Sequence, residues 1–405
     1  MKKAKKLKQN LMLMGKSRLL FIIPGFSLGG TTTALASMLN CGLSDIFDID
    51  IFPICRRNYN PRPLISHDIG MNGLTTAFYG DFSQFCTKDK IRYLFIKLLK
   101  RDKRLLAKLE NWITKRTIKK IEQHKRYNVV VGFQEELATR FTSHFTCPHK
   151  IAWIHCDYAN AFGKEFNELD LYNRFEKIVC VSHFTRQGFI NRYPALEEKT
   201  IAIHNTFDAK RIVKLSKEAI DDHRFDKSQF TIISLGRVHE VKRFYLIPEI
   251  ATQLKDSGLD FRWYILGSAD IPYEFQRLTD AIQKNGMEKN IIYLGGKANP
   301  YPYLKAANLL VTISKSEACP MIFNEAKILH VPVLSADFGS AFEFIEQGKD
   351  GYISSIEMLP QKLIEIVYQS NRINPVNKAD SIHKENAEIV KQLNQLFSNT
   401  ICNPI

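Results

Sequence analysis

Long apolar segments are missing from this 405-residue sequence. No run approaches the roughly 18 to 20 consecutive apolar residues that a membrane-spanning helix needs, so we do not expect an integral membrane protein. The N-terminal "LMLM" is too short for the apolar part of a secretory signal, and no small-residue cleavage site follows it. The chain is therefore predicted to be cytoplasmic.

Paired metal and cofactor motifs are also scarce. The eight cysteines form no CxxC pair and no Cys/His cluster, which argues against a zinc site and predicts reduced, mostly structural thiols. No GxGxxG follows a predicted strand, so a nicotinamide-dependent dehydrogenase is disfavoured. No nucleic-acid-binding motif accompanies the basic residues, which disfavours a nucleic-acid partner.

The apolar residues that are present occur in short runs rich in Ile and Val. "RLLFIIP", "YNVVVG" and "KIAWIH" in the first half, and "FTIISLG", "FRWYILG" and "NLLVTIS" in the second, alternate with helical patterns. This alternation is typical of α/β domains with doubly wound parallel sheets. The length exceeds what one core supports, and a polar stretch at 208–228 separates the two series. We predict two Rossmann-like domains, residues 1–210 and 211–382, facing each other across a cleft.

Positive charge is concentrated in one segment. The formal net charge is +15, and residues 88–126 hold 15 Lys or Arg against 4 Asp or Glu, with apolar residues at helical spacing. A basic amphipathic helix is typical of contact with an anionic membrane surface, although a solvated helix packed on its own domain is the alternative. The predicted membrane contacts are Lys97, Lys100, Arg101, Arg104, Trp112, Lys115 and Arg116.

Two segments after predicted strands could bind phosphate. In "FIIPGFSLGGTTTAL", Gly29 and Gly30 precede a helix whose start one of the three threonines is expected to cap. The first amides of this helix favour anions, although a plain turn with a good N-cap would look similar. In "ISLGRVHEVKRF", Arg237 and Lys242 follow a strand that ends at a glycine, so both cations could reach a diphosphate. Surface cations are common, which leaves a purely solvated role open.

Two glutamates flank a predicted helix start in "SKSEACPMIFNEAK". Glu317 follows the strand "NLLVTIS", Pro320 suits the first turn of the helix, and the amides of Met321 and Ile322 are then unpaired. Carboxylates accept hydrogen bonds from hydroxyls, so this arrangement suits a diphosphate with a polyol at each end, as in a nucleotide sugar. The alternative is that Glu317 and Glu325 only favour the helix dipole.

These stretches together resemble one known family. "SEACPMIFNEA" is similar to the E-x7-E signature of retaining glycosyltransferases of the GT-B fold, particularly glycosyltransferase family 4 of the bacterial surface-polysaccharide type. "GFSLGG", "VCVSHFTRQ", "IAIHNTFD" and "LGRVHEVKRF" resemble further elements of that family in the same order. The similarity extends over about residues 18 to 355. It differs at Ala318, where glycine is frequent, and at "NTFD", so the donor sugar stays open.

The resemblance implies a role for each matching residue. Arg237 and Lys242 would bind the donor diphosphate and stabilise the departing nucleotide. Glu317 would hold hydroxyls of the transferred sugar near its anomeric carbon, and Glu325 would accept the ribose hydroxyls. Cationic side chains would replace a metal, so we expect no metal cofactor, and the sugar would keep its anomeric configuration.

Other parts of the chain take their expected roles from the same resemblance. The Met321 and Ile322 amides would meet sugar and phosphate oxygens, Gly29 and Gly30 would let the first domain close over the phosphates, and His155 would orient the donor sugar or acceptor. A C-terminal helix at about 383–405 would cross back to the first domain.

The expected function follows from these roles. A hexose would move from a nucleotide-diphosphate sugar, such as a UDP-sugar, to a lipid-linked glycan acceptor at the inner face of the cell membrane during capsule or lipopolysaccharide assembly. The alternative is a catalytically inactive GT-B-like partner of another transferase.

Overall fold

The computed structural model describes residues 16–26, 29–55, 96, 103–163, 165–368 and 379–402. The chain divides into two compact units. The first comprises Met1–Val181, Thr185–Thr206 and Glu388–Ile405, and the second comprises Ser182–Phe184 and Phe207–Ala387. Within the described ranges, no helix has the length and apolar character needed to cross a membrane.

The first unit is built on a six-stranded parallel sheet with the order β2-β1-β3-β4-β5-β6. Its strands are the short apolar runs of the sequence, and in β1 the four residues Leu19 to Ile22 are completely buried. The strands are β1 (Arg18–Gly25), β2 (Asp48–Cys55), β3 (Val129–Gly132), β4 (Lys150–Ile154), β5 (Lys177–Cys180) and β6 (Thr200–Ala202). Burial of both faces explains why these strands read as continuous apolar runs rather than alternating ones.

Helices connect and cover these strands. They are α2 (Gly30–Met38), η1 (Leu39–Leu43), α3 (Ser44–Ile46), α6 (Lys103–His124), α7 (Leu137–Thr142), α8 (Tyr158–Ala161), α9 (Leu169–Asn173), α10 (His183–Arg192) and η3 (Pro194–Lys199). The last helix, α18 (Ala379–Cys402), belongs to the first unit from Glu388 onward. There the ring of Phe397 packs edge-on against Phe21 and Phe47, with centroids 6.2 and 5.5 Å away.

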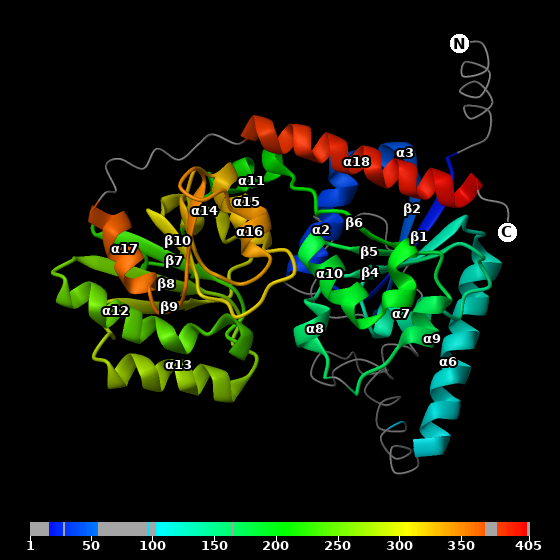
Figure 1. The fold of residues 1–405 in the computed structure, drawn as a ribbon, viewed down its shortest axis with the longest axis horizontal. Coiled ribbons are helices and arrows are strands. Elements are labelled where there is room, and N and C mark those ends of the chain that lie inside the picture. Colours follow the sequence, from blue (N-terminus) through cyan, green and yellow to red (C-terminus); the bar gives the residue numbers. More distant parts are fainter. Residues whose placement is uncertain are drawn as a thin grey trace. The chain divides into compact units, whose positions relative to one another are not determined.

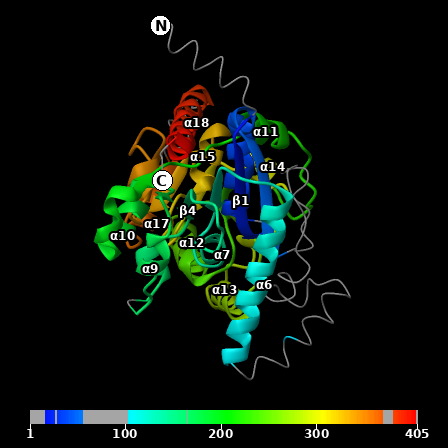
Figure 2. The same ribbon diagram turned by 90° about the vertical axis from the view of Figure 1, so that its right-hand side faces the viewer.

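The long helix α6 is buried along part of its length. Ile118 and Ile121 pack in one core cluster with Leu20 and Ile22 of β1. Toward the N-terminal end of α6, Leu105 and Trp112 are exposed by 44% and 51%. Figure 2 shows α6 extending past the sheet that it covers. The buried residues of α6 begin at Ile113, so the helix joins the core from its middle onward.

The second unit repeats the architecture with another six-stranded parallel sheet, in the order β12-β11-β10-β7-β8-β9. The strands are β7 (Phe230–Leu235), β8 (Phe261–Leu266), β9 (Ile291–Gly295), β10 (Leu309–Thr312), β11 (Val333–Ala336) and β12 (Gly351–Ser354). Its helices are α11 (Ala209–Leu215), η4 (Glu240–Lys242), η5 (Phe244–Leu246), α12 (Ile247–Asp256), α13 (Pro272–Lys284), α14 (Tyr301–Ala306), α15 (Met321–Ile328), α16 (Ala341–Phe344) and α17 (Leu359–Tyr368).

The helices of the second unit form two groups. α12 packs with α13 and α17, whereas α11 packs with α14 and α15. In Figure 1 the strands of this unit run between α12 and α13 on one side and α14 and α15 on the other. Two parallel sheets with helical layers confirm the predicted α/β class with two Rossmann-like domains.

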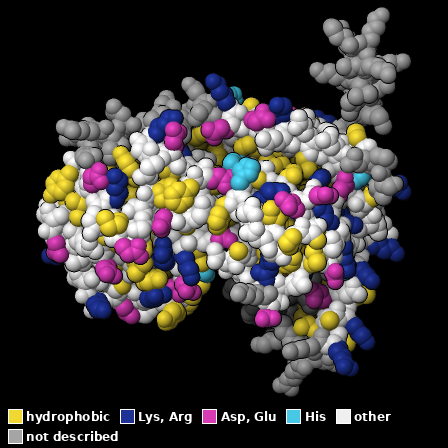
Figure 3. Space-filling view, in the orientation of Figure 1, with side chains coloured by type: hydrophobic (Ala, Val, Ile, Leu, Met, Phe, Trp, Pro, Cys, Tyr) yellow, Lys and Arg dark blue, Asp and Glu magenta, His cyan; other side chains and the backbone are white. Residues whose placement is uncertain are grey.

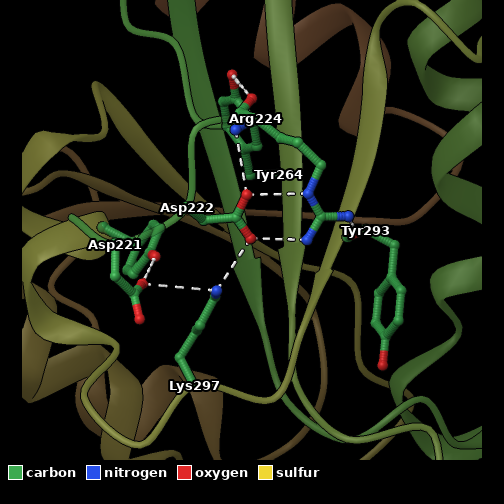
Figure 4. Close-up of polar contacts among 7 residues, drawn as sticks. Asp221, Asp222, Arg224, Tyr264, Tyr293 and Lys297 are labelled. Carbon is green, nitrogen blue, oxygen red and sulfur yellow. Dashed lines mark hydrogen bonds and ion pairs between the residues drawn. The ribbon is translucent and has the colours of Figure 1, made fainter.

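A polar cluster attaches the segment before β7 to the rest of the second unit (Figure 4). The Asp222 carboxylate accepts bonds from Arg224 Nε and Nη2 at 2.9 and 2.7 Å and from Lys297 Nζ at 2.9 Å. Arg224 also donates to the carbonyl of Tyr293 at 3.1 Å. The Tyr264 hydroxyl accepts a hydrogen bond from the Asp226 amide at 2.7 Å. These bonds connect the linker-like stretch to β8, β9 and the segment after β9.

Candidate functional site

The first feature of the site is a pair of glycines at the carboxyl ends of two neighbouring strands. Gly236 follows β7 with φ +148°, and Gly267 follows β8 with φ +154°. A Cβ on Gly267 would lie 1.7 Å from the carbonyl oxygen of Gly236, so a larger residue cannot fit there. A Cβ on Gly236 would lie 3.0 Å from Cε of Lys242. Gly236 therefore leaves room for the Lys242 side chain, and Gly267 leaves room for the backbone of Gly236.

Lys242 reaches a partner from a distant part of the sequence. Its ammonium forms an ion pair with Oε1 of Glu317, in the loop after β10. The same oxygen accepts the Ser314 hydroxyl at 2.7 Å, and the backbone carbonyl of Glu317 accepts the Ser340 hydroxyl at 2.7 Å. Of these side chains, 24% of Lys242 and 18% of Glu317 remain exposed. The structure thus brings together two of the predicted site residues and holds the carboxylate in one orientation.

Arg243 was not predicted, although it supports the same contact. Its backbone is left-handed, with φ 53°. Its guanidinium donates to the carbonyls of Ile313 and Ser314 at 2.7 and 2.9 Å. The amide of Lys315 donates to the carbonyl of Val241 at 2.7 Å. Arg243 and this backbone bond attach η4 to the loop that carries Glu317.

The predicted partner Arg237 behaves differently from Lys242. It directly follows Gly236 and is exposed. Within the described part of the chain, its side chain makes no hydrogen bond or ion pair. The structure therefore does not bring Arg237 into the contact between Lys242 and Glu317, and leaves its guanidinium available to a ligand.

Helix α15 begins at Met321, the start of the expected helical stretch "MIFNEAKIL". Pro320 is its N-cap, with φ −72° and ψ 91°, so the prediction that Pro320 lies in the first helical turn was wrong. In the described part of the chain, no side-chain hydrogen bond caps the helix. The amides of Met321 and Ile322 form the uncapped first turn, which is a favourable environment for anionic oxygens.

Glu325 lies one turn further along α15, where only 8% of it is exposed. Its Oε1 accepts the hydroxyl of Tyr301, the first residue of α14, at 3.0 Å. Burial raises the pKa of Glu325 to about 7, and the hydrogen bond from Tyr301 opposes that rise. Tyr301 was missed because no local motif distinguishes "NPYPYLK" from an ordinary helix start.

In the first unit, His155 follows β4 and has a partner that sequence reasoning missed. Its amide donates to Oε2 of Glu135 at 2.9 Å, and its ring contacts the edge of Phe133 at a centroid distance of 4.5 Å. Among the residues that the structure describes, the buried ring atom Nε2 has no hydrogen-bond partner. Burial lowers the pKa of His155 to about 3, so the imidazole is neutral at pH 7.

Glu135 is the residue that fixes the backbone of this loop. It comes from the segment after β3 and is 9% exposed. Burial raises its pKa, while bonds from the His155 amide and the Cys156 thiol oppose the rise. A single glutamate in "GFQEELA" carries no recognisable pattern, so only the pairing of β3 with β4 could reveal it.

The glycine loop of the first unit is a helix start. Gly30 opens α2, and Gly29 is its N-cap with extended backbone, φ 175° and ψ 170°. Within the described residues, no side-chain hydrogen bond caps the start of this helix. The expectation of a threonine cap was therefore wrong, because the threonines lie inside the helix.

The predicted membrane contacts divide into two sets. Arg104, Trp112, Lys115 and Arg116 are exposed on α6, and the Arg116 guanidinium lies 5.2 Å from the centre of the Trp112 ring. In Figure 3, Lys and Arg side chains gather over the part of the first unit where α6 lies. The other three, Lys97, Lys100 and Arg101, lie outside the described residues.

Comparison with known structures identifies the fold class. The chain is similar to Anabaena HepE in complex with UDP and glucose, with a TM-score of 0.71, 15% identity and coverage of 95% of this chain and 100% of that one. It is also similar to sucrose-phosphate synthase from Thermosynechococcus elongatus, with a TM-score of 0.68, 13% identity and coverage of 95% and 99%. The two units together have the GT-B fold of glycosyltransferases.

Sequence comparison matches part of the second unit to a family of glycosyl transferases. Residues 216–379 match the family described as "Glycosyl transferases group 1". An uncharacterized glycosyltransferase of Methanocaldococcus jannaschii is 27% identical over 41% of this chain and 41% of its own length. The capsular polysaccharide biosynthesis glycosyltransferase CapH of Staphylococcus aureus is 25% identical over 46% of this chain and 49% of its own. The chain therefore matches less than half the length of these curated relatives.

Proposed function

We propose that this protein is a retaining glycosyltransferase of the family 4 type, which moves a hexose from a nucleotide-diphosphate sugar to a glycan acceptor in cell-surface polysaccharide synthesis. The observation that carries the proposal is the contact between Lys242 and Glu317 beside the uncapped start of α15. All of these features lie within residues 216–379, the segment that matches group 1 glycosyl transferases.

Each residue of this group has a distinct chemical task in the proposal. Lys242 and Arg237 neutralise the diphosphate and stabilise the charge that develops on the leaving nucleotide. The amides of Met321 and Ile322 bind phosphate or sugar oxygens. Glu317, which Lys242 and Ser314 already hold in place, accepts hydroxyls of the transferred sugar. Positioning and charge stabilisation by side chains carry the reaction, with no metal required.

Glu325 in the second unit, and His155 and the glycine loop in the first, each have a further role in the proposal. Glu325 accepts the ribose hydroxyls, and the neutral imidazole of His155 offers Nε2 to a sugar or acceptor hydroxyl. Gly29 and Gly30 allow a phosphate to approach the start of α2.

The donor proposed is a UDP-sugar. Structures of Anabaena HepE are described with UDP and with UDP-glucose, and a pneumococcal O-GlcNAc transferase is described with UDP and GlcNAc. Similarity to CapH and to an O-antigen biosynthesis glycosyltransferase of Escherichia coli, 27% identical over 42% of this chain, supports a surface glycan as the product.

The proposed activity is tested by measuring hydrolysis of a nucleotide sugar. The quantity measured is the nucleotide that this hydrolysis releases. The wild-type protein should hydrolyse UDP-glucose or another member of a UDP-, GDP- and ADP-sugar panel slowly when no acceptor is present. Glu317→Ala should abolish this release, whereas Glu288→Ala, at an exposed position of the same unit, should not. Binding of the donor without any turnover would instead favour the inactive partner of another transferase.

A lipid-linked acceptor at the cytoplasmic face of the membrane is proposed from α6. Leu105, Lys108, Trp112, Lys115 and Lys119 recur at intervals of three or four residues, so they share one exposed stripe of the helix. Aromatic and aliphatic groups settle at the interface of a bilayer, while the cations meet anionic headgroups. This arrangement fits a peripheral association that weakens as salt rises.

Flotation with phosphatidylglycerol-containing vesicles tests this association. Lys115→Gln with Arg116→Gln should reduce binding roughly 30-fold, since each cation near the surface is worth about 1 kcal/mol. Lys284→Gln with Lys289→Gln removes the same charge from exposed positions of the second unit and should bind like the wild type. Equal loss in both variants, or no binding at low salt, would contradict a specific role for α6.

A further inference from the structure

The carboxylate of Glu325 is paired at one of its two oxygens. Oε1 accepts the Tyr301 hydroxyl at 3.0 Å. Among the described residues, Oε2 has no hydrogen-bond partner. The pairing joins the first turn of α14 to the second turn of α15, two helices that both pack against α11. The protein itself thus occupies Oε1 of Glu325, whereas Oε2 can still accept a hydrogen bond.

We infer that Tyr301 is a positioning residue for nucleotide recognition, because its hydroxyl occupies Oε1 of Glu325 and presents Oε2 to the two ribose hydroxyls of the donor. The inference rests on the proposed function, which gives Glu325 the ribose. It adds a residue that lies 24 positions away from Glu325 in the sequence. The hydrogen bond does two things: it fixes the rotation of the carboxylate, and it stabilises its charge.

The charge of Glu325 matters because only an ionised carboxylate accepts bonds from both hydroxyls of a ribose. Burial is the main cause of its raised pKa, about 7, and the Tyr301 bond is the opposing influence. Removing the Tyr301 hydroxyl should therefore raise the pKa of Glu325 further. The affinity for the donor should then fall at a higher pH than it does in the wild type.

Other charged groups near this pair lie on α11. Arg211 and Asp208 act on the Tyr301 phenol in opposite directions, Arg211 lowering its pKa and Asp208 raising it. Burial is the larger influence and raises the pKa of the phenol far above its ordinary value, so Tyr301 stays a donor throughout the neutral range. Lys327, on α15 itself, is engaged with Asp350 at 3.0 Å. Glu325 is then the group of this pair that titrates near neutrality.

The experiment is calorimetric titration with UDP-glucose at intervals between about pH 6 and 9. UDP-glucose suits this purpose because its two phosphates keep their charge across the range. For the wild type, affinity should fall as the pH decreases through about 7, by up to tenfold per pH unit. For Tyr301→Phe the midpoint of this fall should move upward by roughly one pH unit, the value of one hydrogen bond.

The control is Tyr303→Phe, two residues along the same helix. The Tyr303 hydroxyl donates to Asp221 rather than to Glu325. Its removal should leave the midpoint where the wild type has it. Glu325→Gln should bind weakly with no midpoint in this range. A purely structural effect of Tyr301→Phe would lower affinity by a similar factor at every pH, and that result would overturn the inference.

A second measurement needs no nucleotide. The carboxyl band of Glu325 in the infrared difference spectrum between wild type and Glu325→Gln reports its protonation directly. The same difference between Tyr301→Phe and the double variant should titrate at higher pH, and an unchanged midpoint would overturn the inference. If the wild type binds none of UDP-, GDP- and ADP-glucose while the infrared shift occurs, the proposed function fails and the pairing of Tyr301 with Glu325 stands.

Discussion

Lys242 and Glu317 form an ion pair although 75 residues separate them in the sequence. Gly236 makes room for the lysine chain, and Arg243 attaches the two loops that carry the pair. Glu317 precedes Met321, the first residue of the uncapped helix α15, by four residues. In the proposed function, the diphosphate binds at this helix start and meets the Lys242 cation, which is already held by Glu317. Lys242 and Ser314 also orient the carboxylate of Glu317, which accepts the sugar hydroxyls in the proposed function.

Replacing Lys242 by Met should strongly reduce the rate of sugar transfer or hydrolysis. The loss of folding stability should be small by comparison. The variant loses the charge that would stabilise the leaving nucleotide, so we expect kcat/KM to fall about 10²- to 10³-fold. Steady-state kinetics with the donor identified by the sugar panel would measure this change. Lys242→Arg should retain part of the activity because it keeps the charge. Equal kcat/KM for Lys242→Met and wild type would contradict a role in the reaction.

His155 should act as a neutral group. Its burial lowers its pKa to about 3, so it gains no proton between about pH 5 and 8. We expect His155→Ala to lower kcat about tenfold or more, since this substitution removes the buried Nε2. The shape of the pH–rate profile in that range should stay the same. Loss of an acidic limb near the ordinary pKa of histidine would contradict this expectation.

The strands and the motif positions could be predicted because they depend on local patterns. The completely buried residues of β1 appear in the sequence as "LLFI", and the positions of Lys242 and Glu317 follow from the strands that end just before them. The partners could not be predicted in the same way. The contacts of Tyr301, Glu135 and Arg243 join separate loops. The register of the parallel sheet sets these contacts, and no single segment of the sequence determines that register.

Small differences at helix starts show the same limit. Pro320 suits a first helical turn by its fixed φ, but here its ψ of 91° keeps it outside α15. The threonines after Gly30 would be good caps, but α2 begins before them. In both cases the approach of the chain to the helix decides the boundary, and tertiary packing determines that approach.

Asp222 should make the second unit sensitive to acid. Its bonds to Arg224, and further to Lys297, hold the pKa of Asp222 well below its usual range. A depressed pKa contributes stability that is present above the ordinary pKa of aspartate and is lost as pH falls through the lower folded-state value. At pH 7, Asp222→Asn should lower the free energy of unfolding by on the order of 2 kcal/mol.

Thermal unfolding from about pH 7 down to pH 2 would check this expectation. The melting temperatures of Asp222→Asn and wild type should approach each other at the acid end, because the wild-type carboxylate is then protonated too. Asp260→Asn removes an exposed carboxylate of the same unit and serves as the matched control. A difference between Asp222→Asn and wild type that stays constant with pH would show that the charge of Asp222 is not what anchors the segment.

Glu325 should have the opposite effect on stability. Its folded-state pKa of about 7 lies above its ordinary value of 4.5, so between these values the folded protein binds a proton that the unfolded chain has released. The free energy of unfolding therefore decreases as pH rises through this window, by about 3 kcal/mol in all for this one group.

Glu325→Gln removes that dependence and should be more stable than wild type at pH 8, with the advantage shrinking toward pH 4.5. Glu288→Gln, at an exposed site, should show no such trend. If Glu325→Gln also loses nucleotide binding, a carboxylate that costs stability at working pH is retained for the ligand, whereas a stabilised variant with unchanged binding would remove Glu325 from the site.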